Sequence, residues 1–350
     1  MSSEKYLRNI WCVLLFMCIV MVFWLLYVLH FIFVPIVTSF FVVILINGIY
    51  SFFQKHLKSK ALSIITTVGI FIGFIFIVGF IINNQIGDFM KNSEKFSQGF
   101  ENILTFFNQY TLYFDIDLTN YWNMPSIKKW FSGLNYGAIG RTIYGAFANF
   151  SALFLTTVVF VLFIFLEIKN LKEKVIHLFD VKGARKFQTI FMRISSDLNI
   201  YFSTKFFLAT LNGTVAMIVM SIFGLDFALT FALIVFFMDF IPIIGAIIAL
   251  GLPFLYSLVT FGNVGMSLLM LLCLYIPQII TANFMEPKIM GDRLNISPLT
   301  LIIALLFWGH FWGIMGAFLA VPIMATFNIV LSKFEHTRFI SVMISQETKK

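Results

Sequence analysis

The sequence predicts an all-α, polytopic integral membrane protein with about eight transmembrane helices, broken or re-entrant in the C-terminal third. Of its 350 residues, 60% are hydrophobic and only 11% are charged, whereas soluble domains average about 25% charged residues. Phenylalanine alone occupies 46 positions. A soluble protein could not cover so much apolar side chain with so few charged groups. Lipid is therefore the expected solvent, and a soluble enzyme is disfavoured.

Three spans are expected within residues 10–83. The uncharged run 10–29 follows Lys5 and Arg8 and lacks a small-residue cleavage site, so it is typical of a retained span rather than a signal peptide. The apolar character then continues to residue 53, too far for one crossing of a ~30 Å hydrocarbon core. Because Pro35 disfavours helix, we expect a turn over residues 30–39. The second span ends at the basic residues 55–60, and the third covers residues 61–83.

Residues 84–149 are the first stretch polar enough to leave the membrane, with five basic and five acidic residues. Apolar residues recur there at helical spacing between Ile86 and Tyr110, which predicts an amphipathic helix on the outer face. We expect this helix to lie on the membrane or on neighbouring spans; the alternative is a partner-binding surface.

Residues 150–205 contain a fourth span, 150–166, followed by a basic region. Between Glu167 and Lys205 there are eight basic and four acidic residues. By the positive-inside rule, this excess places the region and both termini in the cytoplasm of a multi-pass cell membrane protein. The apolar stripe between Phe187 and Phe202 predicts a helix lying on the cytoplasmic leaflet and contacting membrane lipid; we expect no nucleic-acid partner.

Residues 206–332 begin with a span, 206–223, and continue with apolar stretches at 227–261, 264–280 and 299–330. The first and last stretches are too long for a single crossing, and both contain residues that interrupt helices. These residues are Asp239, Pro242, Gly245, Gly251 and Pro253 in the first, and Gly309, His310, Gly313, Gly316 and Pro322 in the last. We therefore expect broken or re-entrant helices here.

Enzyme and pump motifs are missing from the sequence. It contains no HExxH, GxSxG, GxGxxG or GxxxxGK[ST] segment, and its five histidines and three cysteines have no metal-ligand spacing. We therefore expect no enzymatic activity, no cofactor and no metal. Any active transport would have to use an ion or solute gradient.

The run DFIPIIGAIIALGLP, from Asp239 to Pro253, is the first candidate transport path. Opening a helix within the membrane frees backbone groups that can replace water around a solute, and secondary transporters use this device. A carboxylate at such depth is a functional-site candidate. The alternative, equally open, is that Asp239 caps a helix end and faces water.

Two further segments carry weaker signals. The segment EPKIMGDRLNISP, from Glu286 to Pro298, predicts a charged gate through Glu286 and Arg293; alternatively its charges pair locally, Glu286 with Lys288 and Asp292 with Arg293. His310 lies in GHFWG, where a hydrogen-bonded role at a helix interface is favoured over a proton relay.

The segments PIIGAIIALGLP, EPKIMGDRLNISPL and FWGHFWGIMGAFLAVPI resemble, in order and spacing, the hallmark segments of the AI-2E transporters, or PerM-like permeases. The resemblance implies a homo-oligomer in the inner or plasma membrane that moves small solutes, autoinducer-2 in some members and sodium or lithium against protons in others. By motif, Pro242 and Gly245 match the family's proline–glycine pair. The family's charged loop is matched by Glu286, Pro287, Gly291 and Pro298. Its final glycine–proline helix is matched by Gly313, Gly316 and Pro322.

Three hypotheses follow for a single transporter domain over residues 1–350. The first is a secondary transporter of a small polar solute, with autoinducer-2 as the named candidate. The second is a sodium (lithium)/proton antiporter centred on Asp239, which the scarcity of intramembrane charge disfavours. The third is a non-transporting envelope scaffold, which would have no reason to bear the cost of broken helices. The partners expected are the solute, a coupling cation or proton, membrane lipid and further copies of the chain.

Overall fold

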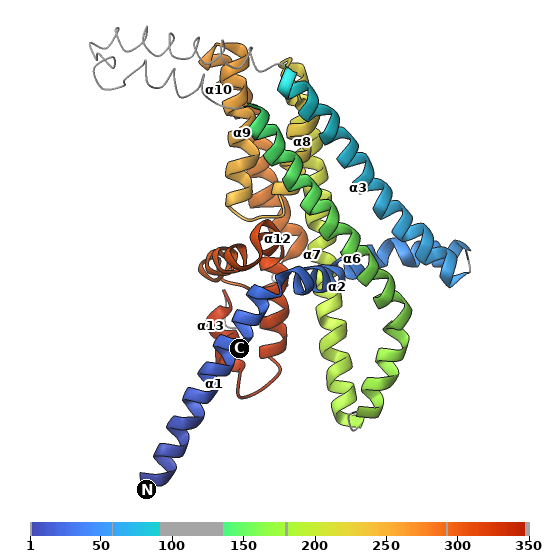
Figure 1. Cartoon of the computed structure of the whole chain (residues 1–350), viewed down its shortest axis with the longest axis vertical. Coiled ribbons are helices and arrows are strands. Elements are labelled where there is room, and N and C mark those ends of the chain that lie inside the picture. Colours follow the sequence, from blue (N-terminus) through green and yellow to red (C-terminus); the bar gives the residue numbers. More distant parts are fainter. Residues whose placement is uncertain (1, 58, 92–135, 179–180, 292, 347–350) are drawn as a thin grey trace. The chain divides into compact units, whose positions relative to one another are not determined.

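The computed structural model describes residues 2–57, 59–91, 136–178, 181–291 and 293–346, and in these residues it contains helices and no strand. Figure 1 shows the chain coloured along the sequence. The helices are α1 (Ser2–Val28), α2 (His30–Leu57), α3 (Lys60–Lys91), α6 (Tyr136–Leu178), α7 (Val181–Ile222), α8 (Ala228–Met238), α9 (Ile244–Phe261), α10 (Val264–Ile280), the π-helix η1 (Thr281–Met285), α11 (Glu286–Met290), α12 (Pro298–Leu331) and α13 (Arg338–Ile344).

Eight helices of the described residues are long and apolar enough to cross a membrane. They confirm the predicted all-α, polytopic membrane fold. The helix α8 has only 11 residues and does not belong to the eight. The outer amphipathic helix expected within residues 84–149 falls largely on 92–135, which lie outside the described residues.

The first expected turn lies earlier than the sequence predicts. The helix α1 ends at Val28 and α2 starts at His30, so the break is at Leu29 and not within residues 30–39. Pro35 lies inside α2, near its start. There it removes one backbone hydrogen bond without ending the helix, because the chain has already turned before it.

The separate interfacial helix expected over residues 187–202 is also different in the structure. These residues belong to α7, which continues unbroken into the following span to Ile222. Ile194, Tyr201 and Phe202 from the predicted stripe are buried instead of facing lipid. No proline interrupts α7, so nothing in the sequence ends the helix between the two segments.

The described chain divides into two compact units interleaved along the sequence. One unit comprises residues 1–64, 152–199 and 294–350, and in it α12 packs against α1, α2 and α13. The indole N–H of Trp312 donates to the carbonyl of Leu26 at 3.2 Å, which fixes α1 to α12.

The helix α12 folds back on itself at Gly313, whose φ of 62° and ψ of −146° are not helical. A Cβ on Gly316 would overlap the carbonyl oxygen of Trp308. In a straight helix, residues eight apart are about 12 Å apart along the axis. The close approach of Trp308 and Gly316 therefore means that the two halves of α12 form a hairpin, as predicted for a broken or re-entrant segment.

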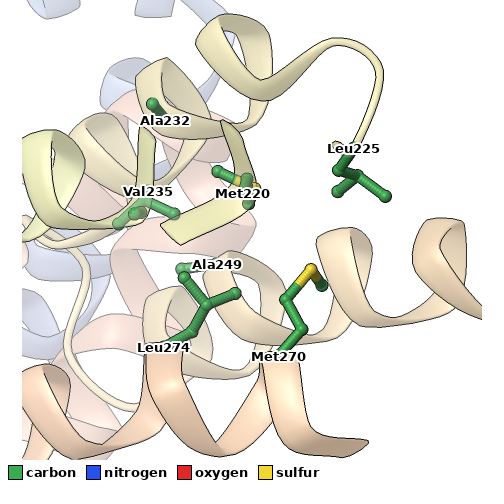
Figure 2. Packing of buried hydrophobic residues seen from close by; sticks show 8 residues of the cluster. Met220, Leu225, Ala232, Val235, Ala249, Met270 and Leu274 are labelled. Atoms are coloured by element: carbon green, nitrogen blue, oxygen red, sulfur yellow. The ribbon is translucent and has the colours of Figure 1, made fainter. Parts of the chain in front are cut away.

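The other unit comprises residues 65–151 and 200–293. Figure 1 shows α9 beside α8 and α10, and the contacts between these helices agree. Their shared core is apolar and also includes the end of α7; seven of its eight buried residues are labelled in Figure 2. The core residues are Ala216, Met220, Leu225, Ala232, Val235, Ala249, Met270 and Leu274. This packing holds the ends of α8 and α10 at fixed positions, and the candidate site lies there.

Candidate transport site

The break between α8 and α9 forms the tip of a helical hairpin. The helix α8 ends at Met238, and the N–H of Asp239 still donates to Val235 at 3.0 Å. The N–H of Ile244 then donates to the carbonyl of Pro242 at 2.7 Å, around Ile243 with φ of 63° and ψ of −65°. This γ-turn with positive φ is rare and strained for a β-branched residue. The sequence prediction of a helix break after Asp239 matches this geometry.

Gly245 closes the hairpin. A Cβ at this position would overlap the carbonyl oxygen of Met238, so only glycine permits the start of α9 to lie this close to the end of α8. With 11 residues, α8 is about 16 Å long, roughly half of a ~30 Å hydrocarbon core. The helix α9, which starts at the tip, has 18 residues and is long enough to cross the core, so the tip joins a short apolar helix to a full-length one.

Four polar side chains meet at the tip, and we call them the polar network: Asn212, Asp239, Gln278 and Thr281. The carboxylate oxygen Oδ1 of Asp239 accepts from Nδ2 of Asn212 and from Nε2 of Gln278, each at 3.0 Å. Nδ2 of Asn212 also donates to the hydroxyl of Thr281 at 3.0 Å. Asn212 and Thr281 are buried. Asp239 thus lies at the C-terminal end of α8, as the capping alternative expects, and is half-buried, with its side-chain partners coming from two other helices.

The residues of the polar network come from helices that lie far apart in the sequence, so the local sequence around each residue does not show that they meet. Asn212 comes from α7, whereas Gln278 comes from the last turn of α10 and Thr281 from the first residue of η1. Thr281 also lies 3.0 Å from the carbonyl of Pro277. The backbone N–H of Thr281 donates to the carbonyls of Pro277 and Gln278, so the turn stays helical while the Thr281 side chain reaches Asn212.

A second polar contact lies further along α7. Nζ of Lys205 is 2.7 Å from Oε2 of Glu286, and the two side chains are only 9% and 27% exposed. The local pairing of Glu286 with Lys288 is therefore not what the structure contains. Seven residues separate Lys205 from Asn212, which places both on one face of α7.

The remaining predicted path residues lie elsewhere. Gly251 and Pro253 are inside α9, away from the tip, and Pro253 is buried. Arg293 is exposed after α11, and Asp292, its proposed partner, lies outside the described residues. Gly313, Gly316 and Pro322 belong to α12 in the other unit. His310 stacks on Tyr27, with ring centroids 6.4 Å apart.

The polar network suits a small polar solute by its donor and acceptor content. Among the described residues, Oδ2 of Asp239 and Oε1 of Gln278 form no hydrogen bond within the protein, so both can accept from a solute. A small cavity borders Asn212 and Gln278 and is otherwise lined mainly by apolar side chains such as Val215 and Leu274. No group of three metal-binding side chains occurs in the described part of the chain.

Sequence reasoning missed Lys205, Asn212, Gln278 and Thr281. A usable signal was present: each is a polar residue within an apolar helical stretch, and Lys205 and Asn212 share one helix face. Their partners lie 27 to 81 residues away in the sequence, and only the fold identifies them.

Comparison with known proteins decides the family. The sequence profile described as AI-2E family transporter matches residues 14–336. The chain belongs to the AI-2E transporter family. This AI-2E chain is 28% identical over 215 residues to a provisionally named transport protein of Borreliella burgdorferi, covering 61% of this chain and 59% of that protein.

Two further relatives extend the comparison. The AI-2 transport protein TqsA of Escherichia coli is 28% identical over 192 residues, 54% of each chain. A provisionally named transport protein of Bacillus subtilis, YrrI, is 26% identical over 329 residues, 90% of each chain. The matches to the first two relatives thus span less than two thirds of their length.

Proposed function

We propose that this AI-2E family chain is a secondary transporter of a small polar solute, and that the solute binds at the polar network. The observation that carries this proposal is the position of Asp239. Its carboxylate lies at the tip of the hairpin between the apolar helices α8 and α9 and is held by carboxamides from α7 and α10. An ionisable group among membrane-spanning helices is costly, and in transporters such groups line substrate and ion sites.

The chemistry favours a neutral solute with several hydroxyl groups. Carboxamides and hydroxyls both donate and accept, whereas the Asp239 carboxylate accepts strongly from a hydroxyl. Autoinducer-2 is the first candidate, because TqsA is named for transporting it. The sodium (lithium)/proton antiporter is less well supported, because ion exchange usually needs a titratable pair near the ion and charged residues are scarce in the apolar helices.

The size of the cavity supports a mechanism in which the helices move. The space beside Asn212 and Gln278 accommodates no more than roughly one water molecule. A solute must therefore displace part of the polar network or separate the helices before it can bind. The α8–α9 break, with its strained turn at Ile243, is the element that absorbs such a change.

The distribution of charged residues and the exposed apolar side chains of α1 support proposals on orientation and assembly. We propose that both termini are cytoplasmic, that a cation or proton drives transport, and that the chain acts as a homo-oligomeric single transporter domain over residues 1–350 without enzymatic activity. The helix α1 supports contacts beyond the chain, because it exposes large apolar side chains such as Trp11, Phe16 and Trp24. Membrane lipid or a second copy would cover this surface.

Flux into proteoliposomes tests the proposal. Purified full-length protein is reconstituted, and autoinducer-2 and a panel of small polyols and cations are offered under imposed sodium, proton or voltage gradients. We expect gradient-dependent flux of a hydroxylated solute and no steady ATP hydrolysis. A folded oligomer that moves nothing in the panel would favour the envelope scaffold, and cation-for-proton exchange without solute flux would favour the antiporter.

A further inference from the structure

The segment after the polar network is a π-helix. The backbone from Ile280 to Glu286 keeps right-handed helical angles, and the N–H of Glu286 donates to the carbonyl of Thr281, five residues earlier. The helix α10, η1 and α11 thus form one continuous rod from Val264 to Met290. Such a π turn contains one residue more than an α turn, and π turns occur frequently at functional sites.

The π turn decides which side chains face α7. In an α-helix, residues five apart point about 140° away from each other, because each residue turns the helix by about 100°. In the π turn they share one face. Consequently Thr281 contacts Asn212 while Glu286 contacts Lys205, and both partners lie on one face of α7. If the segment returned to α geometry without losing a residue, one of the two contacts would have to break.

The Lys205–Glu286 contact is the stronger of the two. It joins opposite charges at 2.7 Å, with the Lys205 side chain only 9% exposed, whereas Asn212 and Thr281 are neutral and meet at 3.0 Å (Nδ2 to Oγ1) and 3.1 Å (Oγ1 to Oδ1). Charge-assisted hydrogen bonds are roughly twice as strong as neutral ones. When the turn relaxes, the contact that gives way is therefore that of Thr281 with Asn212.

We propose that Lys205 and Glu286 are positioning residues of the transport site, and that their ion pair holds Thr281–Met285 in the π form. This inference rests on the proposed function of the polar network. With Glu286 anchored by Lys205, the π turn can relax only by moving Thr281. The hydrogen bond between Thr281 and Asn212 is therefore weakened, and a solute can replace it readily. Without the anchor, the turn relaxes to α geometry while Thr281 keeps its bond to Asn212, and the solute has to compete with it.

A buried tyrosine lies beside this anchor. Tyr201 is one turn from Lys205 on α7 and is 2% exposed, and its hydroxyl has no hydrogen-bond partner among the described residues. This hydroxyl is thus an unpartnered donor on the face of α7 that carries the anchor.

Pro287 offers a competing explanation of the π turn. It has no N–H to donate and follows the turn directly, so it alone could favour the wider helix. The two explanations differ for Glu286→Gln. If the ion pair holds the turn, this variant converts residues 281–285 to α geometry; if Pro287 is sufficient, the π turn stays.

The transport arm of the test uses solute flux in proteoliposomes containing the full chain. We expect Glu286→Gln and Lys205→Met each to raise the KM for solute about tenfold with less change in maximal flux, and the charge-swapped double variant Lys205→Glu/Glu286→Lys to return KM to within about twofold of wild type. The matched control is Lys288→Gln, an exposed lysine two residues from Glu286, which should leave KM unchanged.

A single-residue deletion separates positioning from simple stabilisation. Deleting the exposed Asn283 makes the turn an ordinary α turn that keeps both the ion pair and the Thr281 bond to Asn212. We expect this variant to fold and to lose flux, because Thr281 is no longer poised to leave. Wild-type flux in the deletion variant, or a charge swap that folds without restoring KM, would overturn the proposal.

A structure of the full-length Glu286→Gln variant gives a readout that does not depend on transport. We expect α-helical hydrogen bonds through residues 281–285, in which each backbone N–H donates to the carbonyl four residues earlier. Retention of the bond from residue 286 to Thr281 would refute the proposal whatever the fluxes are. If wild type itself moves no solute, the proposed function fails, and this structure still decides whether the ion pair holds the π turn.

Discussion

At the scale of single residues, the charge of Asp239 separates the transport site from an ordinary polar packing contact. Replacing Asp239 with Asn keeps its size and one oxygen that can accept from the Asn212 and Gln278 amides, but it removes the negative charge and replaces the accepting Oδ2 with a donor. We expect flux to fall by about tenfold, because hydrogen bonds to a charged group contribute about 1.5–3 kcal/mol. Proteoliposome flux of the variant and of wild type under the same imposed gradient checks this.

Expression, oligomeric state and thermal stability serve as controls for Asp239→Asn. Flux equal to that of wild type would mean that the carboxylate is only a structural hydrogen-bond acceptor.

The sequence identified Asp239 but not the residues that hold it. A lone carboxylate among apolar residues is visible in one sequence because charge in a span is rare. Asn212, Gln278 and Thr281 are ordinary polar residues of apolar helices, and nothing in their local sequence shows that they face one another. The partner of Glu286 was missed for the same reason, since Lys205 is 81 residues away whereas Lys288 is adjacent.

At the scale of helices, the closure of the α8–α9 hairpin depends on Gly245. Any side chain at this position would overlap the Met238 carbonyl. We expect Gly245→Val to separate the two helices, lowering stability by about 1–3 kcal/mol and reducing flux more than Gly73→Val does. Gly73 is the matched control, because a Cβ there meets nothing within 4 Å. Thermal unfolding in detergent and proteoliposome flux measure the two effects, and equal losses in both variants would contradict this role of the hairpin.

The sequence predicted two of the helix breaks correctly, but it did not predict the position of the first turn or the continuity of α7. The break after Asp239 and the fold-back at Gly313 were predictable, because proline or glycine occurs in apolar stretches too long for one crossing. The turn at Leu29 and the continuous α7 were not. Pro35 is tolerated early in α2, and charged residues do not end α7 when nothing removes its backbone hydrogen bonds.

At the scale of the whole molecule, the distribution of charge predicts the orientation in the membrane. The region 167–205 has eight basic and four acidic residues, against five and five in 84–149. By the positive-inside rule, single cysteines at Lys182 and Lys95, in a background lacking native cysteines, should react with an impermeant thiol reagent from opposite faces. Lys95 lies outside the described residues, so this prediction depends on charge alone. Labelling of both positions from the same face of intact cells would refute the orientation.

The claim that the polar network binds the solute is tested most directly by a matched pair of buried carboxamides. Asn212 and Asn328 are 4% and 7% exposed, both lie in apolar helices, and only Asn212 contacts Asp239. Uptake of labelled autoinducer-2 is measured in proteoliposomes containing wild type, Asn212→Leu or Asn328→Leu, all with the same oligomeric state. We predict a loss of more than about tenfold for Asn212→Leu and of no more than about twofold for Asn328→Leu. Equal uptake by the two variants would contradict the assignment of the solute site to the tip of the α8–α9 hairpin.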